Sequence, residues 1–512
     1  MKKYKVICAI IVFLIAVALR LWNLNEMGRT WEEGALTEKG YNLIELIKKG
    51  DFSNRYWVDS YDHPPLINYF YGIASYFDFI RFSPSAIPEY LGKKGAPIFT
   101  YDLNHTRLIS VFVSSLAVML VFLFGWKYIS PFVGLTAALV LSSIPYFVGL
   151  SQRVTYESFT MFFFTASVYS FVYFLKKQSI KALILTGLML GMSVEVKQPN
   201  VLLVPLFLSI YYFWNKYSSK ITNKKKVMLK IIYIFAVAFV TYFILWPMPW
   251  FYLKEFTGST YNLWLSGKVG PTPEVFFGRM MGSPIVYFYF LFLIMTPFLL
   301  LILFFIGLKS NYKNKYLMYV LIVWFITPFL LSFQNTRQGG VKYIIQAYAP
   351  FSLLVGIGFN FLLEKFTQSI KIKLFSLLIL FFYLVIVLAR ITPYYFDYFN
   401  ILVGGAKNVY NKKLFLMDGS GEGLRETSLY LEKIAPKGSV VGYNLNPPHT
   451  FKPVNGLNFL KFELDKSYDY VVVNYYSIIR NGFDSNVLQK DYYLVYTVKA
   501  DSAGLAFVYK HK

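Results

Sequence analysis

Residues 6–34 read VICAIIVFLIAVALRLWNLNEMGRTWEEG, an apolar run followed by an acidic pair. Three lysines precede the run, as in a signal peptide, but the run is long and no small-residue cleavage site follows it. We therefore interpret Val6–Leu24 as an uncleaved first membrane span. The lysines predict that the N-terminus lies in the cytoplasm.

Two polar stretches follow this span. The first, Arg29–Gly34, places Glu32 and Glu33 beside a tryptophan where the helix leaves the membrane. The second, Tyr61–Pro65, reads YDHPP. We interpret the acidic pair as an acid/base centre and the second stretch as its support. The alternative is a pair of solvated loop carboxylates and a turn.

The composition is that of an integral membrane protein. Hydrophobic residues make up 56% of the 512 residues and charged residues 15%, whereas soluble proteins have about 45–50% and about 25%. The membrane requires helical spans, because lipid cannot satisfy open backbone groups. The net charge of +24 does not indicate nucleic acid, because most basic residues lie in short loops between apolar segments. The single cysteine, Cys8, excludes an intrachain disulfide and a cysteine-based metal cluster.

The first outer loop, residues 25–105, contains two further helical segments. Ala35–Lys49 has apolar side chains on one helical face and a stop at Gly50, which predicts an amphipathic helix along the membrane interface. Pro65–Ile80 starts with prolines that favour a helix N-terminus, but its about 16 residues are fewer than the ~20 of a span. We interpret it as a re-entrant or interfacial helix.

Ten further apolar segments predict, with the first, about 11 transmembrane helices. With eleven spans, nearly every basic cluster falls on one side of the membrane, as the positive-inside rule requires. A crossing by Pro65–Ile80 would place Lys224–Lys226 outside, which argues against it. The ten segments are Thr106–Phe124, Pro131–Phe147, Tyr156–Leu175, Ala182–Glu195, Val201–Trp214, Ile231–Trp250, Pro284–Leu308, Tyr316–Phe333, Tyr343–Leu363 and Leu374–Leu388.

This topology places ten ionisable residues on the outer side of the membrane. Ionisable groups at the ends of spans tend to line a pathway or a site. For any one of them, snorkelling or solvation in a loop is the simpler explanation, but ten on one face favour a site. The ten are Glu32, Glu33, Asp62, His63, Arg153, Glu157, Glu195, Lys197, Arg337 and Lys342.

Residues 391–512 differ in character from the membrane domain, residues 1–390. They are mixed polar and predict a small extracytoplasmic α/β domain that binds the acceptor or only caps the membrane domain. Neither a GxGxxG nor a Walker A motif occurs in it. The expected elements are a helix at Glu422–Ile434 and strands at Val440–Tyr443, Tyr468–Tyr476, Tyr492–Val498 and Leu505–Tyr509.

An outward-facing site in the membrane has no ready supply of nucleotide sugars, so its simplest sugar donor is a polyprenyl-phosphate sugar. Such a donor requires a carboxylate base for the attacking hydroxyl, cations for the phosphate and an apolar groove for the lipid. The absence of any Asp-x-Asp motif argues against a metal- and nucleotide-sugar-dependent transferase. Glu32 and Glu33 are the candidate bases. The candidate cations are Arg153, Lys197, Arg337 and Lys342.

These motifs resemble those of the GT-C membrane glycosyltransferases, in the group of protein O-mannosyltransferases, aminoarabinose transferases and their bacterial and archaeal relatives. The resemblance covers most of the membrane domain, and the order and spacing of its motifs are more specific than any one of them. It rests on Arg20-Leu-Trp, Trp31–Gly34, Asp62–Leu66, Arg107, Gly187–Lys197 and Lys342-Tyr343.

The resemblance implies roles for individual residues. In that family the first member of an acidic pair, commonly Asp-Glu, is the catalytic base, which implies Glu32 and keeps Glu33 as the alternative. A second acidic residue, commonly Asp, corresponds to Glu157. The Glu substitutions leave open an altered substrate geometry or a lost activity. The substrate-binding residues are expected to be Asp62, His63, Arg153, Glu157, Lys197, Arg337, Lys342 and Tyr343.

We therefore expect a polytopic, GT-C-like plasma-membrane protein with interfacial helices in its first outer loop. It would transfer one sugar, with inversion, from a dolichyl or undecaprenyl phosphate to a hydroxyl of a protein, a glycolipid or a surface glycan. Whether a divalent cation is required stays open. The missing Trp-Trp-Asp signature argues against en bloc transfer of a glycan to asparagine.

Two other classes were weighed against the enzyme. A transporter or flippase of lipid-linked sugars commonly has internal repeats and polar groups near the membrane centre, whereas this sequence has no convincing repeat and its polar groups collect at one face. A membrane scaffold would use the α/β domain to bind a partner and would not need Glu32.

Overall fold

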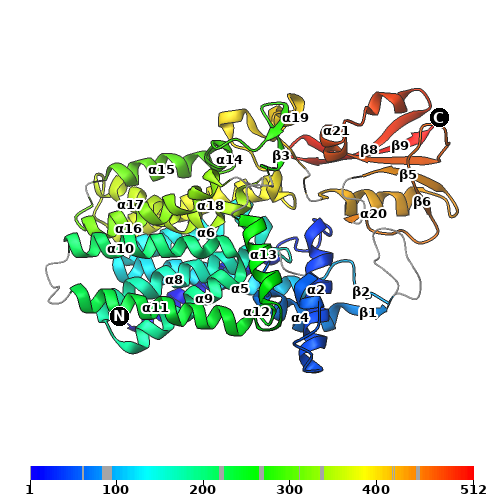
Figure 1. Ribbon diagram of the computed structural model, residues 1–512. Helices are drawn as coiled ribbons and strands as arrows, with labels where there is room; N and C mark the ends of the chain where they lie inside the picture. The colour runs from blue at the N-terminus through cyan, green and yellow to red at the C-terminus, as the bar shows by residue number, and fades with distance from the viewer. Residues whose placement is uncertain are drawn as a thin grey trace.

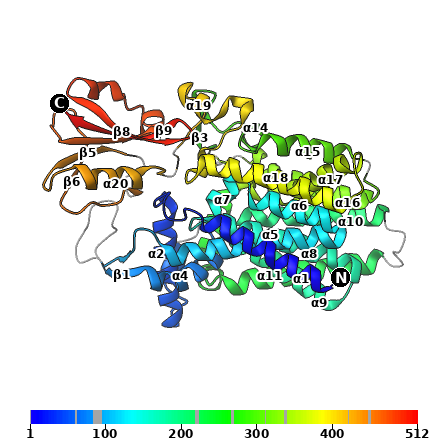
Figure 2. The same cartoon turned by 180° about the vertical axis from the view of Figure 1, so that it is seen from behind.

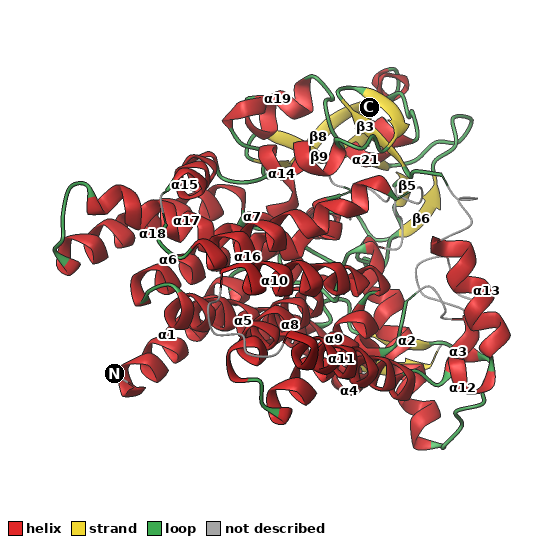
Figure 3. Ribbon diagram, turned by 60° about the vertical axis from the view of Figure 1, so that its left-hand side comes forward, coloured by secondary structure: helices red, strands yellow, loops and turns green. Residues whose placement is uncertain are grey.

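The computed structural model describes residues 2–59, 63–82, 95–217, 224–264, 270–310, 312–334, 340–417, 419, 421–445 and 450–512. These form a bundle of helices and, beyond one end of it, a small domain built on a mixed sheet (Figure 1). The N-terminus lies at the end of the bundle that is remote from this domain (Figure 2). The strands of the domain gather in one corner of the molecule, and helices form most of the rest (Figure 3).

Every apolar segment expected to cross the membrane forms a helix or a pair of helices. Among the described residues, seven helices are long and apolar enough to span a membrane, or up to nine if each of two bent pairs is one span. Two further segments form α9 and α10, which have 17 and 15 residues. The chain is thus a multi-pass membrane protein. The helices are α1 (Lys2–Leu21), α5 (Asn104–Tyr128), α6 (Pro131–Ser142) with α7 (Pro145–Ser151), α8 (Glu157–Lys177), α9 (Ile180–Val196), α10 (Leu203–Tyr217), α11 (Lys224–Leu245), α14 (Tyr287–Ile294) with α15 (Phe298–Lys309), α16 (Lys315–Ile326), α17 (Tyr348–Glu364) and α18 (Ile370–Ile391).

Two of the expected continuous spans are bent. The axes of α6 and α7 differ by 66°, and those of α14 and α15 by 113°. Pro145 and Pro297 lie at the two breaks, where a proline has no backbone N–H to continue the hydrogen-bond ladder. The bends direct α7 and α14 toward a cavity at the end of the bundle that faces the small domain.

Helix α2 (Trp31–Lys48) begins four residues earlier than the expected Ala35. The reason is a capping box, because the Glu33 carboxylate accepts a hydrogen bond from the backbone N–H of Thr30 at 2.8 Å. The expected stop is observed, since the helix ends at Lys48 and Gly50 has a φ of 65°. Trp31, Glu32 and Glu33 therefore form the first turn of a helix instead of a loop.

Helix α2 packs closely against α4 (Leu66–Asp78), the segment interpreted as re-entrant or interfacial. At the crossing, a Cβ on Gly72 would lie 2.3 Å from the carbonyl oxygen of Gly40. Only glycine allows this approach, which fixes α2 against the bundle.

Short elements complete the membrane part: α3 (Tyr56–Asp59), β1 (Phe79–Phe82), β2 (Pro97–Phe99), η1 (Gln198–Leu202), α12 (Met248–Phe251), α13 (Leu253–Trp264), β3 (Pro273–Phe276), β4 (Arg279–Gly282), η2 (Thr327–Phe333) and η3 (Val341–Ala347).

The small C-terminal domain contains a five-stranded sheet in the order β6-β5-β7-β9-β8. Strand β5 pairs in parallel with β6 and β7, and β9 pairs antiparallel with β7 and β8. The four expected strands and the helix are present. The sequence did not predict β6, a short edge strand with little buried surface. The elements after α18 are η4 (Tyr395–Asp397), η5 (Ile401–Val403), α19 (Gly405–Asn411), α20 (Leu424–Ile434), β5 (Val440–Asn444), β6 (Asn458–Lys461), β7 (Tyr470–Asn474), α21 (Tyr475–Arg480), η7 (Ser485–Gln489), β8 (Tyr492–Ala500) and β9 (Ala503–His511).

Candidate active site

Glu33 is fully buried and its carboxylate is occupied by protein groups. Arg107 of α5 donates from Nε to Oε1 at 2.8 Å and from Nη2 to Oε2 at 2.7 Å. The backbone N–H groups of Val154 and Thr30 donate to the same two oxygens at 3.0 and 2.8 Å. Burial opposes ionisation of Glu33, but the Arg107 guanidinium outweighs it and lowers the pKa of the carboxyl below its usual value. Glu33 thus joins α2 to α5 and has no oxygen left for a substrate.

Glu32 points in a different direction, because successive helical residues are rotated by about 100°. Its carboxylate lines the cavity and accepts a hydrogen bond from the Lys342 ammonium at 2.6 Å. The two side chains keep 28% and 25% of their surface exposed. Burial opposes ionisation of Glu32, but Lys342 outweighs it and lowers the pKa of Glu32 to about 2. Glu32 is therefore an ionised carboxylate with access to the cavity.

A chain of contacts leads from this ion pair to other residues that the sequence singled out. The ring of Tyr343 lies 5.5 Å from the Lys342 ammonium and 4.4 Å from that of Lys197. Lys197 in turn pairs with Glu157 at 2.9 Å. His63 stacks on Tyr156, the residue before Glu157, with ring centroids 4.3 Å apart. Lys197 and His63 also act on Glu32 and contribute to its lowered pKa.

Arg153 lines the cavity but is already bound to protein groups. Its Nη2 donates to the Glu422 carboxylate at 2.8 Å, and its guanidinium lies 3.8 Å from the centre of the Phe396 ring. Both Arg153 and Glu422 are buried. Glu422 lies two residues before the start of α20, so this pair fastens the C-terminal domain to the membrane part beside the cavity. Arg153, expected to bind phosphate, thus lines the cavity while paired with Glu422.

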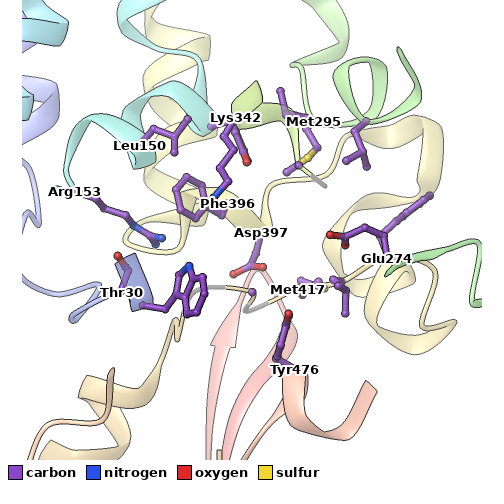
Figure 4. A pocket seen from close by; sticks show the side chains of 18 of the residues that line it. Thr30, Leu150, Arg153, Glu274, Met295, Lys342, Phe396, Asp397, Met417 and Tyr476 are labelled. Carbon is purple, nitrogen blue, oxygen red and sulfur yellow. The ribbon is translucent and has the colours of Figure 1, made fainter. Parts of the chain in front are cut away.

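The cavity has a volume of about 220 Å³ and lies between the bundle and the C-terminal domain. Glu32, Arg153 and Lys342 line it, whereas Glu157, Lys197 and His63 connect to it through Tyr343. Figure 4 shows Glu274 and Tyr476 on the side of the cavity opposite Arg153. Asp397 lies between that side and Arg153. The sequence did not identify four of the residues that line the cavity, namely Glu274, Asp397, Tyr476 and Arg480. Asp397 had a visible feature, an acidic residue soon after the last span, but Glu274 and Tyr476 had none.

Two expected site residues, Asp62 and Arg337, lie outside the described residues. Within the described ranges, no three Asp, Glu, His or Cys side chains cluster closely enough to hold a metal ion. Glu32, the carboxylate that faces the cavity from α2, is paired with an ammonium group.

Comparisons with known proteins give one family match and several similar structures. Residues 85–246 match the family model of dolichyl-phosphate-mannose-protein mannosyltransferases. The structure is similar to the apo oligosaccharyltransferase of Archaeoglobus fulgidus, with a TM-score of 0.52 and 12% identity over 100% of this chain and 75% of that chain. ArnT from Cupriavidus metallidurans bound to undecaprenyl phosphate gives a TM-score of 0.48 and 11% identity over 98% and 97% of the two chains. The sequence matches no curated protein.

The fold is that of the GT-C membrane glycosyltransferases. The segment that matches the family model carries Arg107, Arg153, Glu157 and Lys197.

The two adjacent carboxylates should respond differently to mutation. Glu33→Gln leaves the Arg107 charge buried without its partner, and we expect it to destabilise the protein by about 3–5 kcal/mol. Glu32→Gln removes a partly exposed pair and should change stability little. Thermal unfolding of both variants in one detergent measures the difference. Equal melting temperatures would contradict the structural role of Glu33.

Proposed function

We propose that the protein transfers a single sugar from a polyprenyl-phosphate donor to an acceptor hydroxyl, with Glu32 as the general base. The observation that supports this most strongly is the Glu32–Lys342 pair in the cavity wall. It combines a carboxylate that can accept a proton with an ammonium group that can hold a phosphate. The name of the matched family model, dolichyl-phosphate-mannose-protein mannosyltransferase, agrees with a donor of this class.

The pair suggests how donor binding prepares the base. A donor phosphate competes with Glu32 for Lys342, and Lys197, which contacts Tyr343 from the other side, adds a second positive charge. Once Lys342 turns to the phosphate, Glu32 loses the interaction that lowers its pKa. Its basicity then rises in the presence of the donor, which is when a base is needed.

The reaction is a one-step displacement. The acceptor oxygen forms a bond to the anomeric carbon while the bond from that carbon to the phosphate oxygen breaks on the opposite face. The acceptor proton moves to Glu32, and the electron pair leaves with the polyprenyl phosphate. Lys342 and Lys197 stabilise the charge that develops on the leaving phosphate.

An apolar cavity of about 610 Å³ offers a place for the lipid chain. Its lining includes Gln198, which follows Lys197 in the sequence, and Val201, and it reaches Leu330 and Phe333 of η2. A polyprenyl chain is a branched hydrocarbon, so this lining stabilises it by burial. The tail and the phosphate of one donor would thus lie on the two sides of Lys197.

We propose that the cavity faces the extracytoplasmic side. At the opposite end of the bundle, Lys127 and Lys176 lie 5.2 and 4.5 Å from the ring of Tyr128, near the N-terminus of the chain (Figure 2). Lysines at that end are expected on the cytoplasmic side.

Replacing the base should abolish transfer without loss of the fold. With purified protein in lipid nanodiscs and a panel of polyprenyl-phosphate sugars, we expect Glu32→Gln to lower kcat by about 10²–10⁴-fold, the usual contribution of a general base. Glu45→Gln, on the same helix but away from the cavity, should keep full activity. Product formation is measured by mass spectrometry. Wild-type rates in Glu32→Gln would rule out this mechanism.

The pH dependence should depend on Lys342. With Lys342 present, the pKa of Glu32 is about 2, so the free enzyme holds an ionised base at any pH above about 4. In Lys342→Met, burial still raises the pKa of Glu32 and only Lys197 and His63 oppose it. The acid limb of log kcat/KM against pH should therefore move to higher pH. An unmoved limb would show that Lys342 does not control the protonation of the base.

A further inference from the structure

The cavity has a second wall that the proposed transfer chemistry does not use. Glu274 comes from β3, and Tyr476 and Arg480 come from α21 of the C-terminal domain. Trp31, from the first turn of α2, adds an aromatic ring that is 54% exposed. These residues are far apart in the sequence, and the fold brings them to one cavity, where Glu274 and Tyr476 lie opposite Arg153 (Figure 4).

The polar groups of this wall are already oriented by one another. Arg480 donates from Nη1 to the Tyr476 hydroxyl at 2.5 Å, and its guanidinium lies 5.4 Å from the centre of that ring. Tyr287 donates to Glu274 at 3.4 Å. Burial raises the pKa of Glu274, while Arg480 and Lys342 act in the opposite direction. The Glu274 carboxylate is thus influenced by two cations: Arg480 on its own wall, and Lys342 on the wall that carries Glu32.

The backbone that carries these side chains is anchored on both sides. The β3–β4 hairpin is held to the segment after α19, because the N–H of Gly278 donates to the carbonyl of Leu414 at 3.1 Å and Phe276 bridges to Phe415. Helix α21 is capped by Asn474, whose side chain accepts a hydrogen bond from the N–H of Ser477 at 3.3 Å. A wall on anchored elements loses little entropy when it binds a ligand.

We propose that Glu274, Tyr476 and Arg480 form the acceptor subsite and that the acceptor is a saccharide. This rests on the proposed function, because the acceptor must lie within reach of Glu32. Sugar hydroxyls both donate and accept, so a carboxylate, a phenol and a guanidinium can bind neighbouring hydroxyls of one ring. The exposed face of Trp31 and the apolar Met417 and Leu291 fit the C–H faces of the sugar.

A peptide acceptor fits this wall less well. Peptide recognition commonly uses a free strand edge, an apolar groove or a proline-rich surface. Here the polar atoms belong to charged and phenolic side chains instead. A site that hydrogen-bonds substrate hydroxyls discriminates strongly against analogues that lack them, because its polar groups are then buried without partners.

Direct binding tests the subsite without knowledge of the sugar donor. The full-length protein in nanodiscs is loaded with undecaprenyl phosphate and titrated with methyl hexopyranosides of mannose, glucose and galactose, or with an acetylated Ala-Ser-Ala amide. Saturation-transfer NMR gives the dissociation constants. We expect at least one glycoside to bind more tightly than the peptide. Glu274→Gln, Tyr476→Phe and Arg480→Gln should each weaken its binding about tenfold or more.

Matched controls show whether the effect belongs to the cavity. Arg279→Gln on β4 and Tyr493→Phe on β8 alter exposed residues outside the cavity and should bind the glycoside as the wild type does. Undecaprenyl phosphate should bind equally to all five variants, which confirms that each one is folded.

The outcomes separate this inference from the proposed function. Tighter binding of the peptide, no binding of any glycoside, or wild-type affinity in the three cavity variants would each overturn the saccharide subsite. Those results would leave the Glu32 mechanism intact. Failure of undecaprenyl phosphate to bind the wild type would instead count against the proposed donor.

Discussion

The buried ion pair between Glu33 and Arg107 is the constraint on which the site depends. It fixes the first turn of α2 to α5, and the same carboxylate caps the helix at Thr30 and binds the backbone of Val154. Because helix geometry fixes the angle between neighbours, anchoring Glu33 directs Glu32 into the cavity. Two chemically identical side chains thus take different roles, one structural and one available for chemistry, through their surroundings alone.

The cavity is assembled from parts that are distant in the sequence. Bends at Pro145 and Pro297 bring α7 and α14 to its edge, η3 supplies Lys342, and the C-terminal domain closes the opposite side. The buried Arg153–Glu422 pair holds that domain in place. In the proposed mechanism, the membrane part would bind the lipid-linked donor, the C-terminal domain would help to select the acceptor, and both would meet at Glu32.

The sequence predicted the membrane helices well, because apolar runs and basic loops are local properties. It placed the start of α2 too late, although Thr30-x-x-Glu33 is a readable capping box. It could not show that Arg153 is paired, because the partner, Glu422, is 269 residues away and a cation with a buried partner looks the same in sequence as a free one. Glu274, Tyr476 and Arg480 could not be found, since only tertiary packing brings them together. The pairing of Glu32 with Lys342 was likewise invisible, although each residue was singled out.

A cryo-EM structure of the protein with bound undecaprenyl phosphate tests the central claim most directly. We predict that the phosphate lies against Lys342, that Lys342 has moved from Glu32, and that the Glu33–Arg107 pair is unchanged. A phosphate bound elsewhere, with the Glu32–Lys342 pair intact, would contradict the division of roles between the two carboxylates. So would an Arg107 that leaves Glu33 for the phosphate.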